Sequence, residues 1–293
     1  SLGGRLCALR GLVFFELKHG ALKRTLAAST TDADHVAVAI SRHGATNARE
    51  RDDPIEAARH SVTAQLSEQL ATMRPKALCR ADKGFRANFV GEAADDHGGP
   101  YREVISLVCA ELQSDALSLL VPSPNKVHGA SRGRDAWVPS PSALSPPQLE
   151  WLCFVGQLLG MALRQKETQL SLSLPSMVWK QLVAQPMDAA DLSSFDDLAR
   201  QSLRKLRDIE KEGIDAESFG EVIFETFTTR LSDETQVELR PGGAATPVTF
   251  ANRLEFCEMA MHARLQESQR QCDALLQGLS YMVPQRLLTL FTW

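Results

Sequence analysis

The chain has 293 residues, of which 44% are hydrophobic and 23% charged, and 32 lysines and arginines against 36 aspartates and glutamates give a formal net charge of −4. This composition is that of a globular protein of one large domain or two, and it excludes a disordered chain. The slightly acidic balance argues against a dedicated nucleic-acid-binding protein, whose affinity depends on a basic surface.

The cysteines and the apolar runs narrow the protein class further. The six cysteines form no Cys-x-x-Cys pair and no Cys/His cluster with ligand spacing, which predicts free thiols in a reducing compartment and no structural metal site. The longest apolar run, 151–163, is shorter than the roughly 20 residues that a bilayer span needs, and the first residues lack the apolar stretch of a signal peptide. We therefore expect a soluble intracellular protein without a membrane span.

The beginning of the chain gives weak signals, and the first clear element is a helix. Asp53 has the position of an N-cap, Pro54 follows at the first helical position, and apolar residues recur at helical spacing up to Met73. Pro75 ends this pattern. Apolar and polar residues then alternate over 85–89, which predicts a half-buried strand.

An acidic turn with two glycines, Asp95-Asp96-His97-Gly98-Gly99, is the stretch most suggestive of chemistry. Its carboxylates and its histidine are groups that bind cations or transfer protons. The alternative is a tight turn that places acidic residues near the positive N-terminus of the helix predicted over 101–112. We favour the turn, and because no Gly-Lys-Ser/Thr follows, a phosphate-binding P-loop is excluded.

Prolines concentrated over 121–147 predict an irregular loop, which leads into the most apolar helix of the chain. This helix is predicted over 145–163, begins with Ser-Pro, and carries Gly156 and Gly160 one turn apart. Glycines at this spacing let the backbone of another helix approach closely. We expect this helix at the centre of the core.

The region after residue 188 has a different character. A helical pattern over 195–213 is followed by a change of period over 221–250, which predicts two or three short strands with a hairpin turn at 241–243. A long helix is predicted over 252–278.

Two phenylalanines of these predicted strands, Phe224 and Phe227, fall on opposite faces. One face has to pack on the core of the insert, and the other is free to form an exposed partner surface. The pattern does not say which is which.

The residues by themselves indicate no active site. Cys109, Cys153 and Cys257 lie in apolar helical runs, where a thiol is a small core side chain, and Cys272 has no histidine close in sequence. The residues therefore predict a mostly helical α+β fold with a protruding sub-domain, and neither a catalytic residue nor a cofactor.

Several short stretches follow one another in a fixed order between about residue 84 and Trp293. They are Phe89-Val90-Gly91-Glu92, Asp96-His97-Gly98-Gly99-Pro100-Tyr101-Arg102-Glu103, Phe154-Val155-Gly156-Gln157-Leu158-Leu159-Gly160-Met161-Ala162-Leu163, Asp191-Leu192, Gln201-Ser202-Leu203, Glu238-Leu239-Arg240-Pro241-Gly242-Gly243, Pro247-Val248-Thr249, Asn252-Arg253-Leu254-Glu255-Phe256 and Gly278-Leu279. This ordered series resembles the N-lobe of the HECT family of ubiquitin ligases. The segment 36–80 is similar to the tethering-helix region that precedes the lobe in several large members.

The resemblance implies a fold and a domain organisation. The fold is a mostly helical α+β N-lobe, with a large helical sub-domain over 81–187 and 251–293 and a small strand-containing sub-domain over 188–250. The N-terminal extension over 1–80 contains the tethering helix.

The resemblance also implies a partner. In the family the small sub-domain binds a ubiquitin-conjugating enzyme through a hydrophobic groove, whose positions correspond here to Leu203, Ile209, Val222, Phe224 and Phe256. Exposed apolar anchors rimmed by charge are typical of a transient protein interface. Ala260, one turn after the last of these residues, is small where family members often carry a large aromatic residue.

The family's catalytic cysteine lies in a C-lobe, about 100 residues beyond Trp293 by this resemblance. The parent protein would accept ubiquitin on that cysteine and pass it to a substrate lysine, two steps in place of one difficult transfer. We expect this chain to recruit the conjugating enzyme, to contain no catalytic residue or cofactor, and to be inactive by itself, in the cytoplasm or the nucleus. The alternative is a helical scaffold that has lost ligase activity; the substrate is not indicated.

Overall fold

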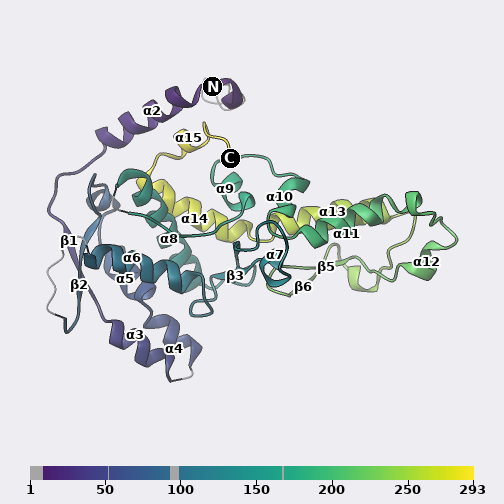
Figure 1. The fold of residues 1–293 in the computed structure, drawn as a ribbon, viewed down its shortest axis with the longest axis horizontal. Coiled ribbons are helices and arrows are strands. Elements are labelled where there is room, and N and C mark those ends of the chain that lie inside the picture. Colours follow the sequence, from purple (N-terminus) through teal and green to yellow (C-terminus); the bar gives the residue numbers. More distant parts are fainter. Residues whose placement is uncertain (1–8, 52, 93–98, 167) are drawn as a thin grey trace.

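A computed structural model describes residues 9–51, 53–92, 99–166 and 168–293 (Figure 1). The helices are α2 (Phe15–Ala28), α3 (Arg42–Arg49), α4 (Pro54–Arg59), α5 (Val62–Ala71), α6 (Gly99–Leu112), α7 (Pro124–Val127), α8 (Pro146–Arg164), α9 (Ser176–Leu182), α10 (Ala189–Ser193), α11 (Asp197–Arg207), α12 (Phe219–Val222), α13 (Arg253–Gln266), α14 (Gln269–Met282) and α15 (Gln285–Leu288). The strands are β1 (Val36–Ile40), β2 (Phe85–Phe89), β3 (Leu120–Pro122), β4 (Trp137–Pro139), β5 (Thr228–Arg230) and β6 (Gln236–Glu238). The prediction of a mostly helical α+β fold is confirmed, whereas the predicted acidic turn at 95–98 lies outside the described residues.

The main core is organised around the contact between α8 and α14. The two helices pack so closely that a Cβ on Gly156 would overlap the carbonyl oxygen of Leu275, and a Cβ on Gly278 would overlap that of Cys153. Gly160 meets the side chain of Met282 in the same way. The predicted close approach of another helix to the glycines of α8 is therefore confirmed. Within the described ranges, no helix combines the length and the apolar character needed to cross a membrane.

A two-stranded parallel sheet joins the N-terminal part of the chain to this core. The predicted strand over 85–89 is confirmed as β2, and its partner is β1, with Val36 opposite Phe85. Alternate residues of β2 are buried, as the sequence pattern indicates. β1 was not predicted, because the strand with which it pairs lies more than 40 residues away along the chain.

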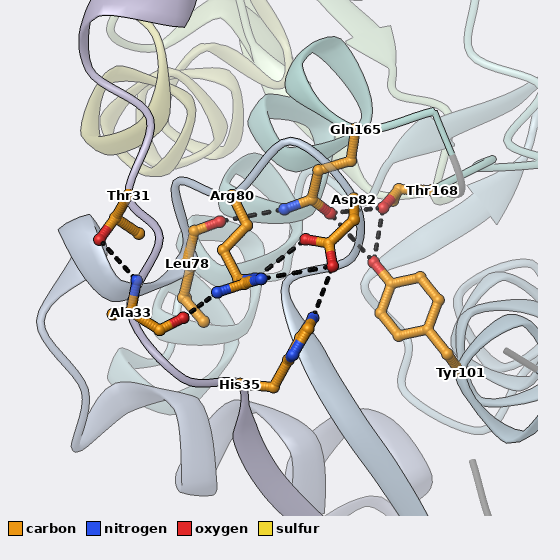
Figure 2. A network of polar contacts seen from close by, with 9 residues as sticks. All are labelled: Thr31, Ala33, His35, Leu78, Arg80, Asp82, Tyr101, Gln165 and Thr168. Carbon is orange, nitrogen blue, oxygen red and sulfur yellow. Dashed lines mark hydrogen bonds and ion pairs between the residues drawn. The ribbon is translucent and has the colours of Figure 1, made fainter. Parts of the chain in front are cut away.

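A network of polar contacts connects the segments next to this sheet to each other (Figure 2). The buried Tyr101 hydroxyl contacts Thr168 at 2.5 Å and donates to Gln165, whose amide in turn donates to the carbonyl of Leu78 at 3.0 Å. Beside them, Asp82 accepts from Arg80 at 2.9 Å and contacts His35 at 2.8 Å. Burial opposes the charge of Asp82, but these contacts and two backbone hydrogen bonds outweigh it and lower the pKa of the carboxyl to about 2.

Two helices predicted as single elements are each divided in two. Asp53 caps α4 as predicted, since its carboxylate accepts from the amide of Ile55 at 3.0 Å. The run then breaks before α5, where Ser61 accepts from the amide of Ala64. The predicted helix over 252–278 breaks between α13 and α14, where the buried Ser268 hydroxyl donates to the carbonyl of Pro139 at 2.6 Å. In the first case the serine caps the new helix, and in the second the serine at the break makes a tertiary hydrogen bond.

A second, smaller core lies at the far end of the elongated molecule, around α11, α12, β5, β6 and the first half of α13 (Figure 1). Its buried members are Leu206, Ile209, Phe219, Phe227, Val248, Phe256, Cys257 and Ala260. The last three come from α13, so this core continues past residue 250 along the chain. The domain boundaries of the sequence analysis stay predictions.

The strands of this smaller part differ in place from the predicted ones. The antiparallel hairpin is formed by β5 and β6, so its turn lies at 231–235. The predicted turn at 241–243 instead leads into a short 3₁₀ helix, Gly243–Ala245, in which a Cβ on Gly243 would overlap the carbonyl oxygen of Phe227. The position of the hairpin turn was therefore predicted wrongly, because a Gly-Gly pair also serves close backbone packing.

Candidate functional site

The smaller core carries an open groove of about 550 Å³ on its surface. One wall is the apolar side of α11, with Ser202, Leu203 and Leu206. The opposite wall is formed by the segment after α12 and by the β5–β6 hairpin, and α13 contributes the floor. The groove therefore lies between segments that are distant along the chain.

The structure brings the five predicted partner-binding residues to this groove, at different depths. Leu203 is half-buried in the α11 wall, whereas Ile209 and Phe256 are buried in the core beneath it. Val222 lines the rim and is 52% exposed, and Phe224 is 80% exposed beside it. Only Val222 and Phe224 therefore present large exposed apolar side chains to a partner.

The predicted strand over Val222 and Phe224 is wrong. Val222 is the last residue of α12, and Phe224 follows in an extended stretch that reaches β5 only at Thr228. Backbone bonds still hold this stretch, because the amide of Val248 donates to the carbonyl of Glu225 at 2.8 Å. The alternation of residues over this stretch arises because one side of the extended chain faces the core and the other faces solvent, although the chain forms no strand.

The structure decides between the two phenylalanines. Phe227 is fully buried and packs edge-to-face with Phe256, with 5.6 Å between ring centroids. The guanidinium carbon of Arg240 lies 3.6 Å from the centroid of the Phe227 ring. Phe224 points out of the core and is exposed. Phe227 therefore belongs to the core, and Phe224 is free to meet a partner.

Several lining residues were missed by the sequence analysis. Ile214 follows Gly213, whose left-handed φ of 82° ends the 3₁₀ helix Ile209–Glu212 and turns the chain toward the groove. Thr228 and Gln236 reach the groove from the hairpin. A glycine in a left-handed turn before an apolar residue is the only local signal, because the hairpin contribution depends on tertiary packing.

Ala260 lies at the bottom of the groove and is only 1% exposed. Its methyl group belongs to the smaller core, so a larger side chain would occupy the space of the groove. The depth of the groove therefore depends on this small residue.

Comparisons with known proteins show which family the sequence matches. The family model described as HECT-domain (ubiquitin-transferase) matches residues 106–293. The human E3 ubiquitin-protein ligase HERC2 is 34% identical over 232 residues, which is 79% of this chain and 5% of HERC2. The human probable E3 ubiquitin-protein ligase HECTD4 is 30% identical over 325 aligned residues, covering 100% of this chain and 8% of HECTD4.

The chain belongs to the HECT family. The mouse E3 ubiquitin-protein ligase HECW1 adds a third relative, 30% identical over 207 residues, or 69% of this chain and 12% of HECW1. The chain therefore spans only a small fraction of the length of the curated relatives it matches. The predicted resemblance to the HECT N-lobe is confirmed.

The described cysteines of this HECT chain are not activated. Burial raises the pKa of all five thiols, to about 11 for Cys257 and about 12 for Cys272. Cys257 lies behind the groove and contacts the carbonyl of Leu203 at 3.4 Å. A thiol with a raised pKa is a poor nucleophile near neutral pH. In the part of the chain that the structure describes, no three His, Cys, Asp or Glu side chains gather as a metal site would require.

Buried charges hold the elements that form the groove together. Arg264 on α13 donates to Asp196, which precedes α11, at 2.7 Å and to Glu267, which follows α13, at 2.8 Å. It also donates to the hydroxyl of Ser232 in the β5–β6 hairpin at 3.1 Å. One side chain therefore fixes α11, α13 and the hairpin relative to each other.

Proposed function

We propose that the groove of this HECT chain docks a ubiquitin-conjugating enzyme, as part of a ubiquitin ligase. The observation that carries the proposal is Phe224, which is 80% exposed between two residues, Ile223 and Glu225, that line the groove. Burying a phenylalanine side chain contributes about 1.5–3 kcal/mol, so an exposed ring is a favourable anchor for a partner.

The charges around the groove support a transient interface. Lys205, Glu212 and Arg230 are exposed and line it together with apolar residues. An apolar centre with a polar rim is typical of complexes that form and dissociate during a reaction cycle. A conjugating enzyme that delivers ubiquitin must leave again, which fits such a surface.

The docking proposal is tested by measuring binding of a panel of ubiquitin-conjugating enzymes to the chain by biolayer interferometry. We expect at least one member to bind and Phe224→Ala to weaken it by about tenfold or more, since 1.4 kcal/mol corresponds to a factor of ten. Phe14→Ala is the matched control, because Phe14 is equally exposed (78%) but directly precedes α2, which lies far from α12 (Figure 1). Equal losses in the two variants, or no binding by any enzyme, would favour the alternative of a scaffold without ligase activity.

We further propose that the cysteine that accepts ubiquitin lies outside these 293 residues. The raised pKa of the described thiols supports this, since each of them is held in its protonated form. Mixing the chain with a ubiquitin-loaded conjugating enzyme and running a non-reducing gel tests it. We expect no ubiquitin adduct on the chain, and a band that disappears on reduction would contradict the proposal.

A further inference from the structure

A second groove, of about 600 Å³, lies on the other side of α11. Its walls are α11 with the 3₁₀ helix that follows, and the loop at 131–132. Residues 200, 201, 204, 205, 208, 211 and 212 recur every three or four positions, so they share one face of the helical segment. The apolar face of the same helix lines the first groove, and α11 therefore separates two grooves of different chemistry.

This second groove contains cations without partners. Among the described residues, Arg132, Arg200, Arg204 and Lys205 form no ion pair, although three carboxylates line the same groove. Two of these carboxylates are already engaged: Asp208 lies 3.4 Å from Lys211, and Asp197 accepts from Gln201 at 2.6 Å. The groove therefore keeps an excess of positive charge on a chain whose net charge is −4.

The wall opposite α11 is held in place. The buried Asn125 donates to the carbonyl of Ser193 at 2.9 Å, and its side-chain oxygen accepts from the amide of Asp197 at 2.7 Å. Gly133, next to Arg132, has a φ of 60°, and a Cβ there would overlap the carbonyl oxygen of Ser194. The loop is thus fixed against the start of α11, and the groove is a formed feature of the fold.

We propose that this second groove binds an acidic segment of a protein partner. Unpaired guanidinium groups on two facing walls suit carboxylates, to which arginine donates two parallel hydrogen bonds. The carboxylates of Asp197, Asp208 and Glu212 between the cations disfavour a nucleic acid, whose phosphates follow each other without a gap. A peptide can place its acidic side chains at the cations alone. The proposal does not depend on what docks in the apolar groove.

The experiment uses the full 293-residue chain and a fluorescein-labelled peptide of Glu-Asp-Gly repeats, about twelve residues long, which is roughly 40 Å when extended. Fluorescence anisotropy measures its affinity, and a Gln-Asn-Gly peptide of equal length is the neutral control. We expect the acidic peptide alone to bind, and its affinity to fall by about tenfold between roughly 0.05 M and 0.5 M NaCl, because salt screens exposed charges.

Variants on the two walls locate the binding site. We expect Arg132→Glu and Arg204→Glu each to weaken the acidic peptide by about threefold or more, and together by about tenfold. Arg207→Glu is the matched control, because Arg207 is an exposed arginine of the same helix that does not line the groove. Phe224→Ala is expected to leave the peptide affinity unchanged, which separates this proposal from docking in the apolar groove.

Three results would overturn the proposal. These are the absence of binding by the acidic peptide, an equal loss in Arg207→Glu and Arg204→Glu, and tighter binding of a thymidine oligonucleotide of equal length. The last result would assign the groove to single-stranded nucleic acid instead. Circular dichroism of each variant confirms that the helices are intact.

Discussion

Arg264 on α13 and Asp196 before α11 form an ion pair in which both side chains are buried, with 2.7 Å between Nη1 and Oδ2. Asp196 is also the N-cap of α11, since its other oxygen accepts from the amide of Ala199 at 2.9 Å. The position of α11, which separates the two grooves, is therefore set by one arginine on a neighbouring helix.

Removing this arginine is expected to destabilise the fold strongly. Arg264→Ala leaves the carboxylates of Asp196 and Glu267 buried without their cation, which costs about 3–5 kcal/mol. Arg230→Ala breaks an exposed pair with Glu234 and is expected to cost less than about 1 kcal/mol. Urea unfolding monitored by circular dichroism measures both, and similar values for the two variants would contradict the role assigned to Arg264.

A second prediction concerns the contact between α8 and α14. In Gly278→Ala the new Cβ would overlap the backbone of Cys153, which cannot move without shifting a whole helix, so we expect a loss of about 3 kcal/mol or more. Gly20→Ala in α2 is the control, because its Cβ would meet only the end of the Arg24 side chain at 3.5 Å. That substitution is expected to stabilise the chain by about 0.5–1 kcal/mol. Thermal unfolding distinguishes the two, and an unchanged midpoint for Gly278→Ala would show that the helices can separate at little cost.

Substitutions of Phe227 and Phe224 are expected to have different effects on stability. Phe227→Ala removes a fully buried ring from the smaller core and is expected to cost about 3–5 kcal/mol. Phe224→Ala removes an exposed ring and is expected to change stability by less than about 0.5 kcal/mol. Hydrogen–deuterium exchange should show faster exchange over 206–257 in the first variant, with β1 and β2 unchanged. Equal exchange throughout the chain would mean that the two cores unfold as one.

Glu267 is expected to make stability depend on pH. Burial raises the pKa of this carboxyl above its ordinary value of 4.5, although Arg264 favours the charged form. The folded chain then retains a proton that the unfolded chain has released, so the stabilisation is complete below about pH 4.5 and is lost as the pH rises through the folded pKa. The difference in free energy of unfolding between the wild type and Glu267→Gln should therefore fall over this window and stay constant above it.

Asp82 provides a control of opposite sign. The pKa of the Asp82 carboxyl is lowered to about 2 from its ordinary value of 3.8. The carboxylate therefore contributes to folding stability above pH 3.8, and this contribution is lost as the pH falls toward 2. The difference in free energy of unfolding between the wild type and Asp82→Asn should decrease only in this acidic range. Chemical denaturation at a series of pH values measures both variants, and a Glu267→Gln difference that does not vary with pH would refute the assignment.

Local signals in the sequence determined several elements correctly. Asp53 and Pro54 mark the start of α4, alternation over 85–89 marks β2, and the glycines of α8 mark a close helix contact. In each case the responsible interaction lies within a few residues or depends on a backbone property of one residue type. The ordered motifs likewise sufficed to identify the HECT family.

Other features depend on partners far along the chain. β1 is defined by its pairing with β2, and the interruption between α13 and α14 is held by contacts of Ser268 with Pro139, more than 100 residues away. No local pattern contains this information, which is why β1 was missed and the long helix was predicted as one.

The composition already described a globular chain with a slightly acidic balance, and the sequence by itself determined its family and its helical character. Only the tertiary structure decided that Phe227 is buried and Phe224 exposed, because both have the same local pattern and differ in what packs against them. It also decided that the acidic chain carries a cationic groove, since Arg132 and Arg204 are brought together by the packing of a loop against the start of a helix. Net charge is a sum over residues, whereas a binding surface depends on where the fold places them.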